Sequence, residues 1–239
     1  MIFSKSNTDN IEEFIAASHS TGAAILIDKP VDWTSFNVVA KIRNLLKVKK
    51  VGHAGTLDPL ATGLLIICTG KFTKKINEFQ DLYKEYTGEI KIGAVTKSYD
   101  SEFPEENIKD ISHISDEMVI ESSRSFIGRH KQFPPMFSAK KVNGKKLYEL
   151  ARKDIKIELK ANEVDFFNVI AKYEPPLVDF YIKCSKGTYI RSFAYDLGEK
   201  LGVGGYLKSL RRTAIGDFRA DDAIKMNDFI DIISNYSGK

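Results

Sequence analysis

Hydrophobic positions along the chain fall into continuous runs and alternating runs, and both kinds predict strands. Residues 23–27 and 64–68 are almost entirely apolar, which is typical of short strands that are buried on both faces. Residues 83–92 alternate between polar and apolar side chains, and this period predicts a half-buried strand with Tyr86 on one face. Residues 178–184 predict a further strand.

Apolar residues at helical spacing predict helices between these strands. Ser35 is expected to cap a helix that carries an apolar stripe on one side. Residues 115–127 and the segment that follows Gly187 also have a helical pattern, and residues 11–17 have the pattern of a short amphipathic helix. The stripe after Ser35 consists of Val38, Val39, Ile42, Leu45 and Leu46.

The segment from Gly52 to Gly63 differs from its surroundings because it is a glycine-punctuated turn that holds one carboxylate, Asp58. Its glycines permit left-handed backbone or close backbone approach, and Pro59 restricts Asp58 to an extended conformation. This arrangement suits an exposed nucleophile on a defined loop. An aspartate before proline more often hydrogen-bonds its own backbone in a turn, so the dipeptide alone does not predict chemistry.

Composition and charge indicate a globular protein and leave its partner open. The chain has 239 residues with 43% hydrophobic side chains, which excludes wholesale disorder. Lysine and arginine total 36 against 32 acidic residues, and the net charge of +4 fits a polyanionic partner without requiring one. The densest basic segment surrounds a hairpin-type turn at Asn143 and Gly144. Its lysines are Lys140, Lys141, Lys145 and Lys146.

Cysteine and histidine placement gives no sign of a disulfide or a metal site. Cys68 and Cys184 lie in apolar segments and are expected to be core thiols. The four histidines, among them His53, do not have metal-ligand spacing. No apolar run reaches the roughly 18 residues needed to span a bilayer, and the polar N-terminus does not look like a signal peptide. A cytoplasmic protein without metal or membrane partners is therefore expected.

Five motifs occur in one order between about residues 22 and 220, and together they resemble the family of TruB-type tRNA pseudouridine synthases. Three positions depart from the family pattern without touching a predicted catalytic residue: Asp32 stands where glycine is usual, Ser98 where threonine is usual, and Phe137 where tyrosine is usual. The motifs are Leu26–Pro30 with Trp33–Ser35, Gly52–Gly63, Lys84–Tyr86, Gly187–Arg191 and Leu210–Arg212.

The resemblance implies an α+β pseudouridine synthase fold, with a mixed and mostly antiparallel sheet, flanking helices and a central RNA-binding cleft. Residues 1–21 carry no motif and are expected to be an N-terminal extension. Residues 22–220 correspond to the catalytic domain, in which residues 131–157 resemble the family's RNA-gripping loop. Residues 221–239 are expected to be a short tail that cannot hold the complete RNA-binding PUA domain of many bacterial relatives.

The reaction that the resemblance implies is the isomerisation of uridine to pseudouridine at position 55, in the T-loop of tRNAs. Asp58 takes the role of the nucleophile, which forms a covalent intermediate without a metal or an organic cofactor. Arg191 is the predicted guanidinium partner that keeps Asp58 ionised. Tyr86 is expected to stack on the flipped uracil and to take part in proton removal from C5. Whether Asp58 attacks C1′ of the ribose or C6 of the uracil stays open.

The resemblance also implies a set of RNA contacts. His53 is expected to fill the space that the flipped nucleotide leaves, and Leu210 to form an apolar wall of the uracil pocket. Apart from the resemblance, lysine-rich residues 140–153 and the pair Arg211 and Arg212 are available to contact phosphates. Extrusion is easiest for a base in a structured loop, so the predicted partner is the T-stem-loop of tRNA, bound by a monomeric protein. Further predicted substrate contacts are Lys29, Tyr86, Tyr189, Lys141 and Lys145.

Other functions fit the residues less well. The main alternative is a tRNA-binding folding chaperone whose isomerase activity is secondary or absent. A nucleotide-binding loop at Gly63–Lys71 is discarded, because the spacing is too long and Phe72 stands where serine or threonine is required. Glycoside hydrolysis usually needs a second carboxylate in an acid role, and none accompanies the motifs.

Overall fold

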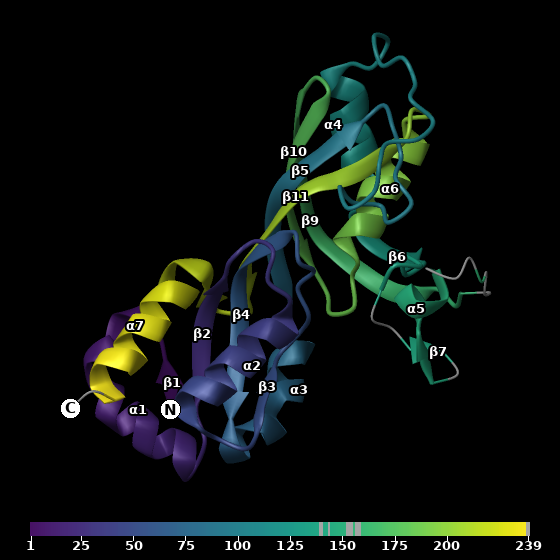
Figure 1. Ribbon diagram of the computed structural model, residues 1–239. Helices are drawn as coiled ribbons and strands as arrows, with labels where there is room; N and C mark the ends of the chain where they lie inside the picture. Colours follow the sequence, from purple (N-terminus) through teal and green to yellow (C-terminus); the bar gives the residue numbers. More distant parts are fainter. Residues whose placement is uncertain (139–140, 143, 152–154, 156–158, 238–239) are drawn as a thin grey trace. The chain divides into compact units, whose positions relative to one another are not determined.

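The chain folds into two compact units, each of which combines strands with helices (Figure 1). The computed structural model describes residues 1–138, 141–142, 144–151, 155 and 159–237. Unit 1 comprises Met1–Tyr86 and Leu210–Lys239, and unit 2 comprises Thr87–Ser209. Two strands, β5 (Lys84–Ile92) and β11 (Gly205–Ile215), begin in one unit and end in the other. The predicted α+β class, with a mixed sheet and flanking helices, is confirmed.

Unit 1 is built on a mixed sheet whose centre is an antiparallel pair, β2 (Ala24–Lys29) and β4 (Ala61–Thr69). The register places Lys29 opposite Gly63, at the end of β4 that follows the Asp58 loop. β11 runs parallel to β4 through Leu210–Arg212. The other strands are β1 (Ile2–Phe3) and β13 (Ile224–Lys225), parallel to β2, β3 (Val51–His53), antiparallel to β4, and β12 (Phe218–Arg219), antiparallel to β11.

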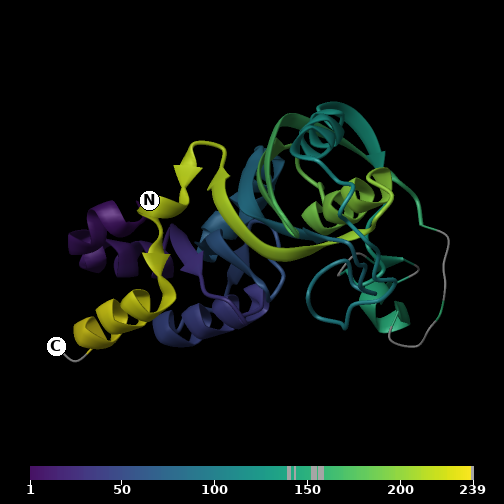
Figure 2. The ribbon, with the colours of Figure 1, turned by 90° about the horizontal axis from the view of Figure 1, so that it is seen from above.

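The apolar runs of β2 and β4 become strands because both faces of this sheet are covered. Ile25 and Ile27 of β2 belong to one core, while Leu26 between them belongs to a second core on the opposite face. Helices α1, α2 and α7 supply the first core, and α2 and α7 lie side by side (Figure 2). The helical elements of unit 1 are α1 (Ile11–His19), α2 (Ser35–Leu46), α3 (Ile76–Asp81), α7 (Met226–Ser237), and the short 3-10 helices η1 (Lys5–Asn10), η2 (Gly70–Lys75) and η3 (Ala220–Asp222).

The first residues of the chain are integrated into unit 1. Phe3 stacks on Phe14 with ring centroids 4.2 Å apart, and Phe229 of α7 meets these rings edge-on at 6.5 Å and 6.2 Å. All three rings are fully buried. Burial of a phenylalanine contributes roughly 1.5–3 kcal/mol, so residues 1–21 share a substantial core with the C-terminal helix.

Unit 2 contains an antiparallel sheet that packs against α4 (Asp116–Arg124) and α6 (Ile190–Lys200). Phe193 of α6 lies 5.5 Å from Phe166 and 6.3 Å from Phe180, two rings on neighbouring strands. The inward residues of those strands are therefore held against the helix that carries Arg191. The elements of the sheet are β6 (Gly128–Gln132), β9 (Asn162–Glu174) and β10 (Leu177–Cys184), while β7 (Lys141–Val142) and β8 (Lys145–Lys146) form a hairpin before α5 (Leu147–Ala151).

The predicted strands and helices are all present, but the predicted helix cap is wrong. Thr34 rather than Ser35 caps α2, because the Thr34 hydroxyl accepts the N–H of Asn37 at 3.0 Å. Ser35 is the first residue of the helix, and its hydroxyl hydrogen-bonds the backbone of Leu57. Cys68 and Cys184 are buried thiols that form no disulfide, as expected. Within the described ranges, no helix is both long enough and apolar enough to cross a bilayer.

Candidate active site

Asp58 lies in unit 1 on the loop between β3 and β4, and its neighbours are fixed by side chains from distant parts of the chain. The side chain of Asp58 is partly exposed, while Leu57 before it is buried. Ser35 at the start of α2 accepts the N–H of Leu57 at 2.8 Å and donates to the Leu57 carbonyl at 3.1 Å. One hydroxyl therefore satisfies both backbone groups of the residue that precedes the carboxylate.

Arg212 holds the first half of the same loop from inside unit 1. Its side chain is 1% exposed, and its guanidinium donates to three carbonyls: Leu64 at 2.8 Å, Gly55 at 3.2 Å and Thr56 at 3.4 Å. The expectation that Arg212 contacts phosphate is thus wrong, because its donors are directed to the backbone. Gly63 allows the backbone of Arg212 to lie close to β4. It has a φ of +98°, and a Cβ there would lie 2.3 Å from the Arg212 carbonyl oxygen.

Lys29 holds the second half of the loop. It is fully buried, and its ammonium donates to the carbonyls of Trp33 at 2.6 Å, Pro30 at 2.8 Å and Pro59 at 3.3 Å. Burial lowers the pKa of Lys29 to about 8, although Asp58 and Asp32 oppose the shift. These contacts support a bracing role for Lys29, while its contact with substrate stays a prediction.

Asp32 explains one departure from the family pattern. Its backbone has a φ of +64°, a left-handed conformation that glycine adopts without strain and aspartate tolerates better than most residues. The N–H of Asp32 donates to the Pro59 carbonyl at 2.9 Å. Aspartate in place of glycine therefore preserves the turn that supports the loop.

His53, at the end of β3, has an uncharged imidazole. Burial, followed by the nearby Arg212 guanidinium, lowers the pKa of His53 below its usual range, so the ring is neutral at pH 7. Its buried Nδ1 has no hydrogen-bond partner among the described residues. The ring is therefore suited to stacking or filling space rather than to ionic contact.

Tyr86 and Leu210 lie on the strands that leave unit 1. Tyr86 is 8% exposed on β5, on the buried side of the predicted alternation. Leu210 is partly buried and pairs in register with Ala61, whose N–H donates to the Asp58 carbonyl at 3.1 Å. The structure thus brings Leu210 next to the end of the Asp58 loop.

Arg191 lies in unit 2 at the start of α6, and it is a buried residue rather than part of a surface ion pair. Its side chain is 5% exposed, and its Nη1 donates to the Ser98 carbonyl at 3.1 Å and lies 3.4 Å from Oδ2 of Asp100. Asp100 in turn accepts the Ser98 hydroxyl at 2.5 Å and the N–H of Glu102 at 3.0 Å. Sequence reasoning missed Asp100, although it is the carboxylate in the turn that follows Gly93.

Tyr189 anchors the beginning of the predicted RNA-gripping loop. The side-chain amide of Gln132 accepts the N–H of Tyr189 at 2.8 Å and donates to the Tyr189 carbonyl at 3.1 Å, and Ser192 donates to the Phe133 carbonyl at 2.7 Å. Lys141 and Lys145 belong to the paired strands β7 and β8, but their side chains lie outside the described part of the structure. Residues 139–140, 143, 152–154 and 156–157 of this loop also lie outside it, as does residue 158.

A group of exposed lysines gathers in unit 1 where β3 begins and β4 ends. The N–H of Gly70 donates to the Lys50 carbonyl at 2.9 Å, which places the start of η2 beside the segment before β3. Within the described residues, no carboxylate lies within 4 Å of any of these six ammonium groups. We call them the η2 lysine cluster: Lys47, Lys49, Lys50, Lys71, Lys74 and Lys75.

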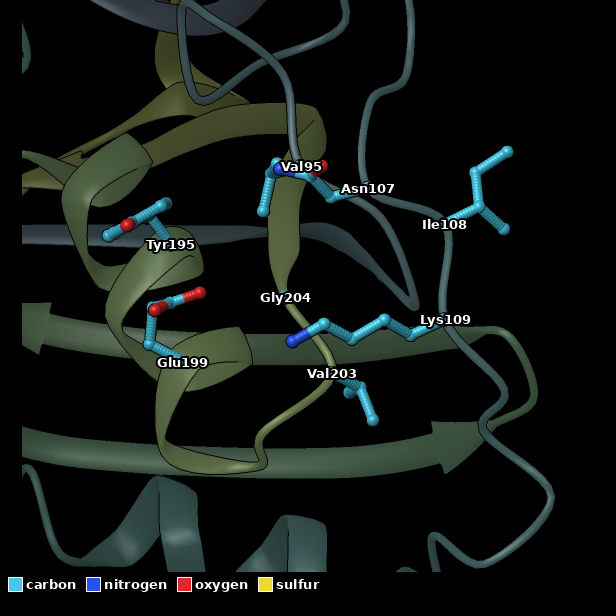
Figure 3. Close-up of a pocket in the computed structure, with 8 residues that line it drawn as sticks. All are labelled: Val95, Asn107, Ile108, Lys109, Tyr195, Glu199, Val203 and Gly204. Atoms are coloured by element: carbon cyan, nitrogen blue, oxygen red, sulfur yellow. The ribbon is translucent and has the colours of Figure 1, made fainter.

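Unit 2 also contains a hollow with a volume of about 480 Å³ beside the C-terminal half of α6 (Figure 3). Tyr195 and Glu199 of α6 lie on one side of the hollow, and Asn107 and Lys109 lie on the other. Lys109 donates to the Gly202 carbonyl at 2.9 Å. In the part of the chain that the structure describes, no group of three or more His, Cys, Asp or Glu residues is arranged to hold a metal ion.

Comparisons with known proteins agree over nearly the whole chain. Residues 43–190 match the family model described as TruB family pseudouridylate synthase (N terminal domain), and residues 191–239 match the tRNA pseudouridylate synthase B C-terminal domain. The chain is 51% identical to tRNA pseudouridine synthase B of Chloroherpeton thalassium, over 89% of this chain and 90% of that protein. It is 49% identical to tRNA pseudouridine synthase B of Chlorobium chlorochromatii, over 91% and 88% respectively.

A solved structure supports the fold. The chain is similar to a crystal structure of a Cbf5-Nop10-Gar1 complex, with a TM-score of 0.72 and 27% identity. The similarity covers 96% of this chain and 59% of that one, so the present chain spans less than two thirds of the solved chain.

Proposed function

Because the chain belongs to the TruB family and is an isomerase of tRNA uridine, we propose that its target is the T-loop uridine at position 55 and that Asp58 is the nucleophile. The observation that carries this proposal is the bracing of the Asp58 loop. Ser35, Arg212 and Lys29 hold backbone groups of the residues on both sides of Asp58, while its carboxylate stays accessible. A fixed and accessible carboxylate meets the geometric demand of nucleophilic catalysis.

The reaction exchanges one bond for another within the substrate. The glycosidic bond from C1′ to N1 breaks, a bond from C1′ to C5 forms, and the proton on C5 is released while N1 gains one. Neither an oxidant nor an energy source is required, and a covalent bond to Asp58 divides the exchange into two easier steps. In this proposal Arg191 favours the ionised form of the nucleophile, and Tyr86 stacks on the uracil and assists removal of the C5 proton.

RNA binding in this proposal combines extrusion of the base with phosphate contacts. Extrusion costs a few kcal/mol of stacking, and a neutral ring such as His53 compensates part of this cost by filling the vacated space. The η2 lysine cluster offers six exposed ammonium groups without acidic partners among the described residues. Such groups bind a phosphate backbone and make binding sensitive to salt.

The test is a comparison of catalysis and binding in one variant. Asp58→Asn keeps the size of the side chain and removes its nucleophilic oxygen anion. We expect no tritium release from C5-labelled uridine in tRNA, with affinity for tRNA within about threefold of wild type, because the residue contributes chemistry rather than binding. Asp9→Asn, the same substitution at an exposed position in η1, serves as the control and retains full activity.

The target position is tested by the substrate. We expect no product from a tRNA in which cytidine replaces uridine at position 55, and full conversion of a T-stem-loop that retains this uridine. An active Asp58→Asn variant would refute the assignment of Asp58 as the nucleophile. A wild-type protein that binds tRNA but releases no tritium would favour the folding chaperone instead.

A further inference from the structure

We propose that Tyr195 is a positioning residue for Arg191, and that it acts by stacking on Tyr99 in the turn that carries two groups in contact with the guanidinium. The proposal rests on the catalytic role assigned to Arg191 above. All of the residues concerned belong to unit 2.

The turn from Thr96 to Asp100 is the structure that orients Arg191. The guanidinium contacts the Ser98 carbonyl at 3.1 Å and the Asp100 carboxylate at 3.4 Å, so Tyr99 lies between the two contact residues in the sequence. The Thr96 hydroxyl donates to the Asp100 carbonyl at 2.6 Å, and the N–H of Tyr99 donates to the Thr96 carbonyl at 3.2 Å. A shift of this turn therefore moves two groups that contact Arg191.

Tyr99 adopts a conformation that its own side chain disfavours. Its φ is +64°, which lies in the left-handed region that costs energy for a residue with a Cβ. One backbone contact at Tyr99 comes from outside the turn, the N–H of Leu207, which donates to the Tyr99 carbonyl at 3.0 Å. An additional contact is needed on the side chain, and the Tyr195 ring supplies it.

The stacking partner comes from the same helix as Arg191. The rings of Tyr99 and Tyr195 are 4.1 Å apart between centroids, with 18° between their planes. Because Tyr195 follows Arg191 by four residues on α6, the two side chains lie on one face of the helix, about one turn apart. The helix thus carries the guanidinium and also secures the turn that orients it.

Because Tyr195 borders the hollow in unit 2, its stacking on Tyr99 is a larger share of the contacts that hold its ring. Tyr195 lines the hollow together with Glu199, so part of its surroundings is open rather than packed by protein (Figure 3). Among the described residues, neither phenol oxygen of the pair has a hydrogen-bond partner. In this proposal the ring of Tyr195 holds Tyr99 by stacking, and the Tyr195 hydroxyl is not needed for that contact.

The experiment measures the rate of pseudouridine formation and the KM for tRNA in matched variants. We expect Tyr195→Ala to lower kcat by about 10- to 100-fold through misplacement of Arg191, with KM unchanged within about twofold. Tyr195→Phe retains stacking and restores kcat to within about twofold. Tyr173→Ala removes a buried aromatic ring from β9 of the same unit and serves as the control, with thermal destabilisation but no loss of kcat.

A combined variant separates positioning from general destabilisation. Since Tyr195 acts through the turn that carries Asp100, the loss in Tyr195→Ala with Asp100→Asn should be smaller than the product of the two single losses. If Tyr195→Ala does not fold, Tyr195→Leu, which keeps apolar contact without ring stacking, replaces it with the same expectation. The inference is overturned if Tyr195→Phe is as slow as Tyr195→Ala, if the loss falls on KM alone, or if the two losses multiply.

The proposed function and this inference fail in different ways. Full activity of Arg191→Lys would overturn the role proposed for Arg191, and the inference with it. An inactive Arg191→Lys beside a fully active Tyr195→Ala would overturn the inference alone.

Discussion

Arg212→Lys should damage the Asp58 loop although it keeps the positive charge. The guanidinium reaches three carbonyls, those of Leu64, Gly55 and Thr56, from three different nitrogens. A lysine ammonium is a single nitrogen on a flexible stem and cannot span them. Two of the three carbonyls then lose their donor in a region where Arg212 itself is 1% exposed.

The expected loss in the free energy of unfolding follows from the number of carbonyls that lose their donor. Each buried acceptor left without a donor costs about 1–3 kcal/mol, so the loss of two donors should lower the free energy of unfolding by about 2–6 kcal/mol. For a chain of this size that corresponds to a fall of about 4–24 °C in Tm. The rate of pseudouridine formation should also fall, because the backbone that presents Asp58 is no longer held.

Arg211→Lys is the matched control, because it is the same substitution at the neighbouring position. Arg211 makes two hydrogen bonds of 2.9 Å with the Asp28 carboxylate, and its side chain is 38% exposed. Because lysine keeps the charge and one bond to this partly exposed carboxylate, the loss in Arg211→Lys should be about 1 kcal/mol. Thermal unfolding and single-turnover kinetics of both variants form the assay. Equal stability and equal rates for the two variants would refute the bracing role of Arg212.

Three further predictions address the remaining features. Asp100→Asn should lower kcat by about 10- to 100-fold, because Arg191 loses the carboxylate charge that lies 3.4 Å from it; a wild-type rate would contradict a role for this ion pair in orienting Arg191. Burial, followed by Glu199, raises the pKa of Asp196 to about 6. The charged carboxylate therefore destabilises the fold above pH 6. This loss of stability disappears below the ordinary pKa of 3.8, where Asp196 is protonated in both the folded and the unfolded chain. Asp196→Asn should raise stability by about 1 kcal/mol at pH 8, after allowance for solvent screening, and the gain should vanish by pH 3.5; an equal gain at both pH values would exclude this cause. Replacement of Lys50, Lys71 and Lys74 by glutamine should reduce the salt dependence of tRNA binding by roughly 2 in the log–log slope, with Lys5→Gln unchanged; an unaltered slope would exclude the η2 lysine cluster as a phosphate contact.

Local sequence signals predicted the elements and the position of the loop. The apolar runs of β2 and β4 indicated buried strands because both faces of each strand are covered, and Gly63 and Pro59 marked the turn around Asp58. These features depend on residues that are close in the sequence, so a single chain is sufficient to read them.

The roles of the buried cations could not be read from the sequence. Arg212 follows another arginine, and such a pair is typical of a phosphate contact on the surface. Its actual partners, Gly55 and Thr56, lie more than 150 residues earlier in the chain. Only the pairing of β11 with β4 brings them together. Asp100 was missed for the same reason, because it meets Arg191 across 91 positions of sequence.

The choice of carbonyls as partners for Lys29 and Arg212 has an electrostatic consequence for Asp58. A buried cation that pairs with a carboxylate has part of its field offset by that partner, as Arg191 has beside Asp100 within unit 2. Lys29 and Arg212 instead donate to backbone oxygens that carry no net charge, so both keep their positive charge beside the loop. Asp58 opposes the lowering of the Lys29 pKa, so the carboxylate lies close enough to interact with this ammonium. The same hydrogen bonds that fix the backbone thus leave two positive charges beside the loop that carries Asp58, which a brace built from ion pairs would not provide.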